Sequence, residues 1–338
     1  MDPEKIKHYT IPVFIPELAC PFQCVFCDQR KISGKQESPL VEEVRRTIEE
    51  HLATIPPAGT YVEIGFFGGN FTGIPLGLQE TYLASAGEYL KSGRIKGIRL
   101  STRPDYISAE KLKLLKSYGV SSIELGAQSL DPDVLRLSGR GHNAEDITEA
   151  SGLILQEGFS LGLQMMIGLP GDTPEKSIFT ARRIVELGAD NTRIYPTLVI
   201  KGTKLEQMYL RGKYKPLELN EAVLRAKSVT EIFESAGVKI IRMGLHPSEG
   251  LLSGEHLVAG PYHVSFRELV QTEIWNGILK PLRAEGGKVL TVSVSPAEFN
   301  SAVGYNARNK KELLENFHKV RFITDPAIKG RKFIADYN

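Results

Sequence analysis

A regular alternation of short apolar runs and helical patterns constrains the fold of this chain most strongly. Runs rich in β-branched and aromatic residues recur about every thirty residues, which is the rhythm of βαβ units in a parallel sheet. We predict strands at residues 9–15, 61–67, 98–102, 122–125, 160–167 and 191–196, and a seventh apolar run follows at residues 238–243. Six strands that are each followed by a helix predict an α/β fold, a partial (β/α)6 barrel of the TIM-like type.

Helix start signals support this division of the chain. A capping side chain stands directly before a proline at three places between the expected strands, namely Ser38-Pro39, Asp131-Pro132 and Thr173-Pro174. Proline suits the first helical position, and the preceding oxygen can accept a backbone N–H of the first turn. We therefore expect helices to begin at these three points.

The rhythm stops after about residue 250. A helix at residues 266–283, a strand at 289–294, a basic helix from Arg308 and a short strand at 321–324 are expected there. We therefore divide the chain into a barrel at residues 1–250 and a small α+β extension at 251–338. The 338 residues exceed one ordinary core, and we expect the extension to cover the mouth of the barrel.

Composition places few limits on partners. A net charge of +2 is close to neutral, and 24% charged residues are usual for a globular protein. The first ten residues carry acids and lack the apolar stretch of a signal peptide, and no apolar run has the length of a membrane span. We expect a cytoplasmic protein without a membrane partner.

All three cysteines, Cys20, Cys24 and Cys27, lie in the run CPFQCVFC, directly after the first expected strand. Three thiolates can hold three irons of a [4Fe–4S] cluster and leave the fourth iron open for chemistry. A structural zinc site needs a fourth ligand, and His8 and His51 lie outside this loop. A disulfide would leave one thiol over, and three buried apolar cysteines would not need to cluster. The iron–sulfur interpretation is favoured.

Other candidate residues lie where the expected strands end, which is where ligands gather in such barrels. Glycine pair Gly68-Gly69, followed by Asn70, lets backbone approach a ligand, although it also suits a plain turn. Arg103 suits an anion, although taken alone it favours the alternative of an ion pair with Asp105. His142 is a candidate proton donor or, alternatively, a helix-cap residue.

The C-x3-C-x2-C spacing, with Phe26 before the last cysteine, resembles the signature of the radical S-adenosylmethionine (radical SAM) superfamily. The segments GAQSLD, SGRGH, GLPGDTPEK and RIYPTLVIKGTKLEQMY resemble the radical SAM half of the Elongator catalytic subunit and its bacterial relatives, over about residues 10–248. The Gln-to-Arg spacing also resembles the coproporphyrinogen-dehydrogenase-like branch. This resemblance implies S-adenosylmethionine on the open iron of a [4Fe–4S] cluster, a 5′-deoxyadenosyl radical and an electron donor of the flavodoxin or ferredoxin type.

The resemblance also implies roles for individual residues. The expected cluster ligands are Cys20, Cys24 and Cys27. The residues expected to bind S-adenosylmethionine are Phe26, Gly68, Gly69, Asn70, Ser101, Gln128, Arg140, Gln164, Ile167, Gly168 and Leu169. Arg103, Tyr195 and Lys201 are expected to face the reaction volume as catalytic residues.

Two departures from the relatives limit what carries over. The Elongator subunit has a longer gap between its first two cysteines and an acetyltransferase domain, and no acetyl-CoA loop is evident in the last part of this chain. Coproporphyrinogen dehydrogenase usually has another cysteine where this chain has Gln29. Chemistry with acetyl-CoA and decarboxylation of porphyrinogen are therefore not expected.

Three substrate hypotheses remain open. The first is RNA, most plausibly tRNA, with two basic patches and neighbouring aromatic residues as its surface. The patches are Lys201, Lys204, Arg211, Lys213 and Lys215, and then Arg308, Lys310, Lys311, Lys319, Arg321, Lys329, Arg331 and Lys332. The second is a small molecule or tetrapyrrole, enclosed near His246, His256 and His263. The third is a non-catalytic protein that holds a cluster or haem. Basic runs are also often plain solvated surface.

Overall fold

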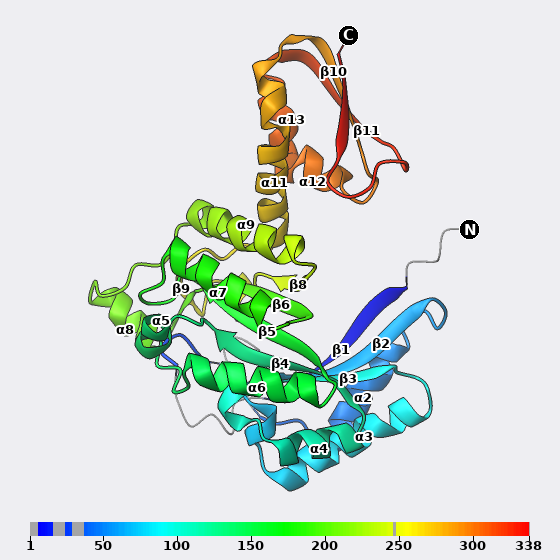
Figure 1. Ribbon diagram of the computed structural model, residues 1–338, viewed down its shortest axis with the longest axis vertical. Coiled ribbons are helices and arrows are strands. Elements are labelled where there is room, and N and C mark those ends of the chain that lie inside the picture. Colours follow the sequence, from blue (N-terminus) through cyan, green and yellow to red (C-terminus); the bar gives the residue numbers. More distant parts are fainter. Residues whose placement is uncertain (1–5, 16–23, 29–36, 246–247, 338) are drawn as a thin grey trace.

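A seven-stranded parallel sheet forms the centre of the computed structural model, which describes residues 6–15, 24–28, 37–245 and 248–337 (Figure 1). Its strands are β1 (Lys7–Ile15), β2 (Thr60–Gly68), β3 (Gly97–Thr102), β4 (Val120–Gln128), β5 (Ser160–Ile167), β6 (Asn191–Pro196) and β8 (Lys239–Met243). They pair in the order β1-β2-β3-β4-β5-β6-β8, each parallel to the next. The predicted partial barrel is confirmed, and the seventh apolar run joins it as an edge strand.

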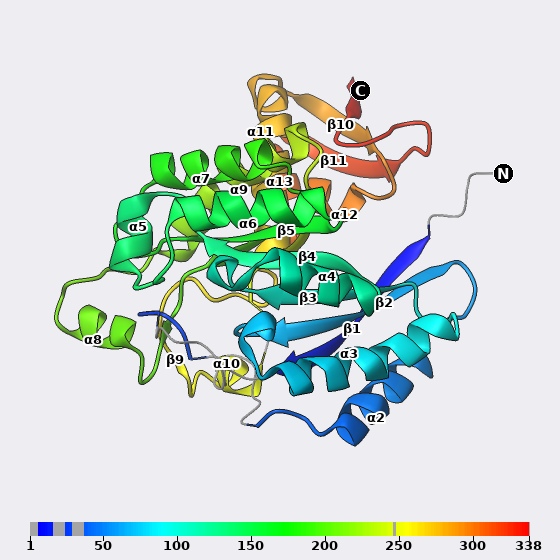
Figure 2. The same ribbon diagram turned by 60° about the horizontal axis from the view of Figure 1, so that its bottom comes forward.

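Helices cover the outer face of this sheet, so that its inner face is left for a ligand (Figures 1 and 2). The covering helices are α2 (Val41–Leu52), α3 (Leu76–Lys91), α4 (Ala109–Ser117), α6 (Ala144–Gln156), α7 (Pro174–Glu186) and α9 (Leu219–Ser235). Their apolar sides pack against strand residues such as Ile64, Ile98 and Leu163, all fully buried. Strands covered in this way read as continuous apolar runs, which is why they were visible in the sequence.

Shorter elements follow the carboxyl ends of the strands. They are η1 (Phe71–Gly73), η2 (Pro104–Tyr106), α5 (Pro132–Leu137), β7 (Val199–Ile200) and α8 (Lys204–Leu210). These elements surround the mouth of the barrel. They therefore lie at the end of the barrel where ligands gather in such folds.

Two of the three expected helix caps are confirmed. Asp131 Oδ1 accepts the N–H of Val134 at 3.0 Å, and Thr173 Oγ1 accepts the N–H of Lys176 at 3.3 Å. The third expectation was wrong, because α2 begins at Val41 rather than at Pro39. There the Glu43 carboxylate accepts the N–H of Leu40 at 2.8 Å, so a side chain inside the first turn replaces the expected serine cap.

The extension forms a second apolar core. Helix α11 (Phe266–Leu279) packs against α9 and ends before Pro281, where η3 (Lys280–Ala284) begins. A three-stranded sheet follows, made of β10 (Gly287–Val294), β11 (Phe317–Thr324) and β12 (Phe333–Tyr337), with α12 (Phe299–Val303), η4 (Tyr305–Ala307) and α13 (Arg308–Leu313). Trp275 of α11 lies in this core. The strands expected at 289–294 and 321–324 are confirmed, whereas β12 was not foreseen.

Only the first part of the extension lies beside the barrel mouth. Helix α10 (Glu249–Leu252) and β9 (Leu257–Ala259) lie there, and β9 pairs with β7 (Figure 2). The three-stranded sheet stands beyond α11 (Figure 1), and Arg331 Nη2 donates to Glu234 Oε1 near the end of α9 at 2.8 Å. This placement corrects the expectation that the whole extension covers the mouth, because α11 carries the sheet away along α9. The boundary near residue 250 stays a prediction.

Within the described ranges, no helix combines the length and the apolar character that a membrane span requires.

Candidate active site at the barrel mouth

A cavity of about 870 Å³ occupies the inside of the barrel. All seven strands contribute to its wall, from Phe14 of β1 to Arg242 of β8. At the mouth it is lined by Phe26, Cys27, Gly68 and Gln128, among others. A volume of this size is typical of ligand-binding clefts. The cavity therefore brings the cysteine loop and the strand ends together, as predicted from the chain direction.

The described part of the cysteine loop is a tight turn. Cys27 donates its N–H to the carbonyl of Cys24 at 3.1 Å, which places the two cysteines close together. Val25 donates to Ser138 at the end of α5 at 3.0 Å and accepts from Leu205 of α8 at 2.7 Å. Cys20 lies outside the described residues. The loop is therefore anchored on two sides, and two of the three expected cluster ligands are held by it.

Gly68 is required by the close approach of two strands. Its φ is +135°, and a Cβ added there would lie 1.8 Å from the carbonyl oxygen of Ile15. Every other residue would collide with β1 just before the cysteine loop. Gly68 also lines the cavity, so a ligand meets bare backbone at this point.

Gly69 and Asn70 are not among the described residues that line the cavity. The Asn70 Oδ1 accepts the hydroxyl of Thr102 at 2.7 Å and the N–H of Arg103 at 3.4 Å. This corrects the expectation for Asn70, because its amide oxygen is occupied by β3. The polar group that ends β2 connects two strands instead of facing the ligand.

Gln128 is the most unusual residue at the mouth. Its backbone is left-handed, with φ of 67°, although it is not glycine, and it lies where the pairing of β4 and β5 is irregular. Its side chain lines the cavity, and its Oε1 is buried without a hydrogen-bond partner among the described residues. Such backbone strain, about 1–3 kcal/mol, gathers at functional sites, and a buried polar atom without a partner fits a polar ligand.

Arg140 connects this strand end to the cysteine loop. Its Nη1 donates to Cys24 Sγ at 3.1 Å, and its Nη2 donates to the carbonyl oxygen of Gly126. A Cβ on Gly126 would lie 3.0 Å from Gln128 Nε2 and 3.3 Å from Arg140 Nη2. Glycine therefore leaves room for both side chains. A cationic donor beside the sulfur fits a thiolate ligand, whereas a contact of Arg140 with S-adenosylmethionine stays a prediction.

Arg103 was expected to be catalytic, but the structure supports the alternative pairing. Its Nε and Nη2 donate to Asp105 Oδ1 and Oδ2, both at 2.9 Å, and Nη2 also donates to the carbonyl of Arg140 at 2.8 Å. The side chain is buried and is not among the described residues that line the cavity. Arg103 therefore positions the backbone of Arg140, because the fixed Asp105 pair holds its guanidinium.

His142 lies behind this cluster. Its ring is buried, and Nδ1 lies 3.9 Å from Asp105 Oδ1. Burial lowers the pKa of His142 to about 3, and the charges of Arg140 and Arg103 act in the same direction. The ring is therefore neutral near pH 7. It is not among the described residues that line the cavity, which does not fit a proton donor to a substrate.

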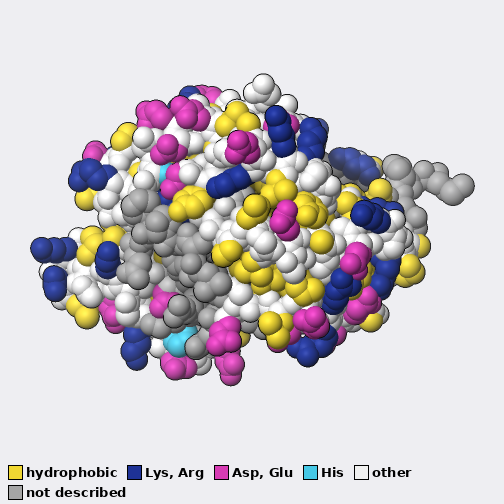
Figure 3. All heavy atoms as spheres, turned by 90° about the horizontal axis from the view of Figure 1, so that it is seen from below, with side chains coloured by type: hydrophobic (Ala, Val, Ile, Leu, Met, Phe, Trp, Pro, Cys, Tyr) yellow, Lys and Arg dark blue, Asp and Glu magenta, His cyan; other side chains and the backbone are white. Residues whose placement is uncertain are grey.

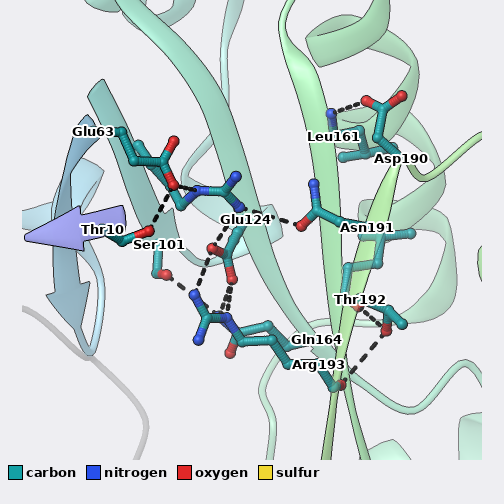
Figure 4. A network of polar contacts seen from close by, with 12 residues as sticks. Thr10, Glu63, Ser101, Glu124, Leu161, Gln164, Asp190, Asn191, Thr192 and Arg193 are labelled. Carbon is teal, nitrogen blue, oxygen red and sulfur yellow. Dashed lines mark hydrogen bonds and ion pairs between the residues drawn. The ribbon is translucent and has the colours of Figure 1, made fainter. Parts of the chain in front are cut away.

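A buried ion network crosses the inner face of the sheet (Figure 4). Arg99 Nε donates to Glu63 Oε1 at 2.8 Å, and its Nη1 donates to Glu124 Oε1 at 2.9 Å. Arg193 Nε and Nη2 hold both oxygens of Glu124, at 2.5 and 2.9 Å. Burial alone would raise the pKa of Glu124, but Arg193 and Arg99 hold it below its ordinary value. Glu124 and Arg193 therefore stay charged inside the barrel.

Sequence reasoning missed this network. Each member is the single charged residue of its strand, as Glu63 is in TYVEIGFFG. A buried charge is costly unless it is paired, so four single charges on β2, β3, β4 and β6 were a signal that the sequence offered. One predicted residue contacts the network, since Gln164 Nε2 donates to Glu124 Oε2 at 3.0 Å, and Ser101 Oγ accepts from the same Nε2 at 3.3 Å. Both line the cavity.

The backbone after β5 is bonded within the protein. The carbonyl of Ile167 accepts the N–H of Thr197 at 2.9 Å, and Gly168 donates to Asp172 at 2.7 Å and accepts from Tyr214 at 2.6 Å. Ile167 and Leu169 are buried in apolar clusters. None of these three residues is among the described ones that line the cavity, so adenine contacts here stay a prediction. Tyr214, one of the aromatic residues within the first basic patch, is buried and therefore not exposed as a stacking surface.

The last two predicted residues have different positions. Tyr195 lines the cavity, and burial raises the pKa of its hydroxyl although Arg193 opposes the shift. Lys201 is exposed and is not among the described residues that line the cavity. Its N–H donates to the carbonyl of His256 at 3.0 Å. The expectation for Lys201 was wrong, because β7 pairs with β9 and leaves the barrel register.

An open parallel barrel with a cysteine-bearing loop after its first strand, and a cavity at the strand ends, defines an α/β barrel enzyme of the kind that works at its mouth. Residues 15–184 match the Radical SAM superfamily, and residues 189–276 match the Radical_SAM C-terminal domain. The chain belongs to the radical SAM superfamily and is a radical SAM enzyme. Members of this family use S-adenosylmethionine and a [4Fe–4S] cluster.

Two curated relatives are similar over much of the chain. The tRNA uridine(34) acetyltransferase of Dehalococcoides mccartyi is 28% identical over 239 residues, which cover 61% of this chain and 52% of that protein. An uncharacterized protein of Methanocaldococcus jannaschii is 33% identical over 233 residues, covering 65% of this chain and 70% of that protein. The chain thus spans about half the length of the acetyltransferase.

The fold is also similar to a solved structure, the archaeal Methanocaldococcus infernus Elp3 with N-terminus deletion. The TM-score is 0.65 at 23% identity, covering 80% of this chain and 63% of that one. These relatives confirm the resemblance to the Elongator catalytic subunit that the motifs indicated. The Elp3 structure shares the barrel with this chain, which spans less than two thirds of it.

Proposed function

We propose that the chain cleaves S-adenosylmethionine reductively and uses the resulting radical to modify an RNA, most plausibly a tRNA. The observation that carries this proposal is the cavity that joins the cysteine turn to the strand ends. The residues fit the two implied groups: Cys24 and Cys27 lie in one turn, and Gln128 Oε1 is a buried acceptor without a described partner. Cys20, Cys24 and Cys27 together would hold a [4Fe–4S] cluster. When bound, the cluster supplies one electron to S-adenosylmethionine, which yields the 5′-deoxyadenosyl radical.

The chain's own residues bind and orient the cofactor. Phe26 presents an apolar face at the mouth, Gly68 presents bare backbone, and Gln128 presents an amide. Ser101 and Gln164 offer polar atoms deeper in the cavity. Tyr195, with its raised pKa, keeps its proton near pH 7 and can donate a hydrogen bond to the substrate. The buried wall excludes water from a reactive species.

Support for RNA comes from the relatives' names and from one basic surface. Lys204, Arg211, Lys213 and Lys215 are all exposed around α8, beside the mouth. In the second patch, Arg308 is paired with Glu273 and Glu312, and Arg331 is paired with Glu234. Figure 3 shows a face where Lys and Arg alternate with Asp and Glu around hydrophobic side chains. Carboxylates therefore offset positive charge in the second patch. The surface around α8 is the better candidate for binding RNA.

A small-molecule substrate is the second candidate, and the size of the cavity favours it. About 870 Å³ suits a cofactor with one small substrate or one extruded nucleoside, but not folded RNA. The histidines expected to line it lie elsewhere: His263 Nδ1 accepts the N–H of Ser265 at 3.0 Å, and His256 accepts from Lys201. His246 lies outside the described residues. A tetrapyrrole has no specific support, and membership of an enzyme family argues against a non-catalytic role.

Isotope transfer separates the two candidates. Reduced, cluster-loaded protein with S-adenosylmethionine is given either deuterated tRNA or a deuterated metabolite extract, and deuterium in 5′-deoxyadenosine is measured. We expect transfer from the tRNA fraction. Transfer from the metabolite fraction alone would exclude RNA as the substrate. Enzymes of this family need a reductant, and we propose a flavodoxin or ferredoxin type donor, in a cytoplasmic setting.

A further inference from the structure

The edge strand β8 carries a bulge that changes which side chains face the cavity. Asn191 pairs with Lys239 and Thr192 with Ile240, but Arg193 pairs with Arg242. One extra residue, Ile241, therefore stands between the paired positions. A bulge of this kind re-aims the residues that follow it. Here it brings Arg242 beside Arg193, on the side of the sheet that faces the cavity.

Two guanidinium groups are consequently neighbours in a partly buried place. Arg193 is held by Glu124 and lies over the ring of Phe67 at 4.9 Å. The Arg242 Nε donates to the carbonyl of Gly244 at 3.2 Å. Burial lowers the pKa of Arg242, Tyr195 opposes the shift, and the charge of Arg193 lowers it further. Glu124 is already shared by Arg99 and Arg193, so a further anion would stabilise this pair.

The rest of this edge is also cationic. Lys239 at the start of β8 and Arg267 at the start of α11 line the same cavity, and neither side chain makes an ion pair with a described residue. The carboxylates among the described lining residues are engaged: Glu63 accepts from Arg99 and Thr10, and Asp190 accepts the N–H of Leu161 at 2.9 Å. Positive charge is therefore in excess along β8.

We propose that Arg193, Arg242, Arg267 and Lys239 form a subsite for a phosphate group of the substrate along the β8 edge of the cavity. Guanidinium groups bind phosphate oxygens through paired N–H donors. A phosphate bound between two neighbouring guanidinium groups also offsets the repulsion between their positive charges. The proposal rests on the proposed function, because it names the class of its substrate as a phosphate ester. The phosphate belongs either to a nucleotide within RNA or to a small molecule.

The test uses cluster-loaded protein saturated with S-adenosylmethionine, so that the cofactor's carboxylate cannot account for the result. Binding of uridine 5′-monophosphate, uridine and an anticodon stem-loop RNA is measured by calorimetry. We expect the monophosphate to bind about 10- to 100-fold more tightly than uridine. Arg242→Gln is expected to lower the ratio of the two affinities about tenfold, and Arg242→Lys is expected to lower it less. Arg182→Gln, an exposed arginine of α7, is the matched charge control.

Arg267 is exposed at the start of α11, so Arg267→Gln is expected to fold. This variant tests the subsite if the β8 variants unfold. Loss of monophosphate binding identifies a small phosphate ester, and loss confined to the stem-loop identifies an RNA phosphate. Variants that bind both probes as the parent does would overturn the subsite. Cleavage of S-adenosylmethionine by the parent is measured separately. A parent that binds the monophosphate through Arg242 without cleaving the cofactor would refute the proposed function and leave the subsite standing.

Discussion

At the scale of single residues, the site depends on two positions, 68 and 128, where the backbone geometry restricts which residues fit. Gly68 has no room for a side chain against Ile15, and Gln128 holds a left-handed backbone while its Oε1 is buried without a described partner. Both lie at the carboxyl end of a strand. The first gives a ligand access to backbone, and the second offers it an amide oxygen without a hydrogen-bond partner among the described residues.

Replacing Gln128 with alanine tests the second point. The substitution removes the amide and keeps a non-glycine residue in the left-handed conformation at this position. The affinity for S-adenosylmethionine should therefore fall about tenfold, which corresponds to the loss of one good hydrogen bond. Equilibrium dialysis against the labelled cofactor measures it. Gln207→Ala, exposed on α8, is the control. An unchanged affinity in Gln128→Ala would show that the amide does not contact the cofactor.

His142 makes a prediction about acid stability. Its pKa is about 3 in the folded protein and about 6.5 when unfolded, so the unfolded state binds the extra proton between these values. Stability should therefore fall as the pH drops through this window, by about 1.4 kcal/mol per pH unit from this group. Urea unfolding at several pH values measures the slope, which His142→Leu should reduce. The exposed His318→Gln should keep it, and equal slopes in both variants would contradict the assignment.

At the scale of elements, what could be read from the sequence depended on how local its cause was. The strands and the helices that begin at Pro132 and Pro174 follow from apolar runs and capping, which neighbouring residues determine. The directions of Arg103 and Lys201 could not be read, because they depend on Asp105 and on the pairing of β7 with β9. The cysteine loop, Gly68 and Gln128 were placed correctly, since strand direction alone brings them to the mouth.

The ion network gives the clearest test at this scale. Glu124→Gln removes a buried carboxylate from between Arg99 and Arg193, which leaves two buried cations without it. The free energy of unfolding should fall by about 3–5 kcal/mol, as it does when one partner of a buried pair is lost. Urea denaturation measures it. Glu49→Gln breaks an exposed pair with Arg94 and should cost less than about 1 kcal/mol. Similar losses in the two variants would contradict the account.

At the scale of the whole molecule, the chain combines an open half-barrel with a separate small core. Helix α10 and β9, at the start of the extension, lie with α8 beside the mouth, whereas the three-stranded sheet lies beyond α11 (Figures 1 and 2). Two clusters of buried apolar side chains, one in the barrel and one around Trp275, reflect this division. The extension therefore reaches the cavity through Arg267 at the start of α11, and no described residue of its sheet lines the cavity.

Arg331 tests how the sheet is attached. It donates to Glu234 of α9 and to Gln271 of α11, so Arg331→Ala should speed hydrogen exchange in β10, β11 and β12. The global free energy of unfolding should change by less than about 1.5 kcal/mol, because the pair is partly exposed. Arg321→Ala, exposed on β11, should leave exchange as in the parent. Faster exchange in the barrel strands instead would show that the two cores are not separate.

The central claim is that the cysteine turn and the cavity together hold a [4Fe–4S] cluster with S-adenosylmethionine bound to it. Electron paramagnetic resonance of the anaerobically reconstituted, dithionite-reduced protein tests this most directly, with and without the cofactor. We predict a cluster signal that shifts when S-adenosylmethionine is added, with 5′-deoxyadenosine as product, and loss of both in Cys27→Ala. A signal that S-adenosylmethionine leaves unchanged, in a protein with about four irons per chain, would contradict the account.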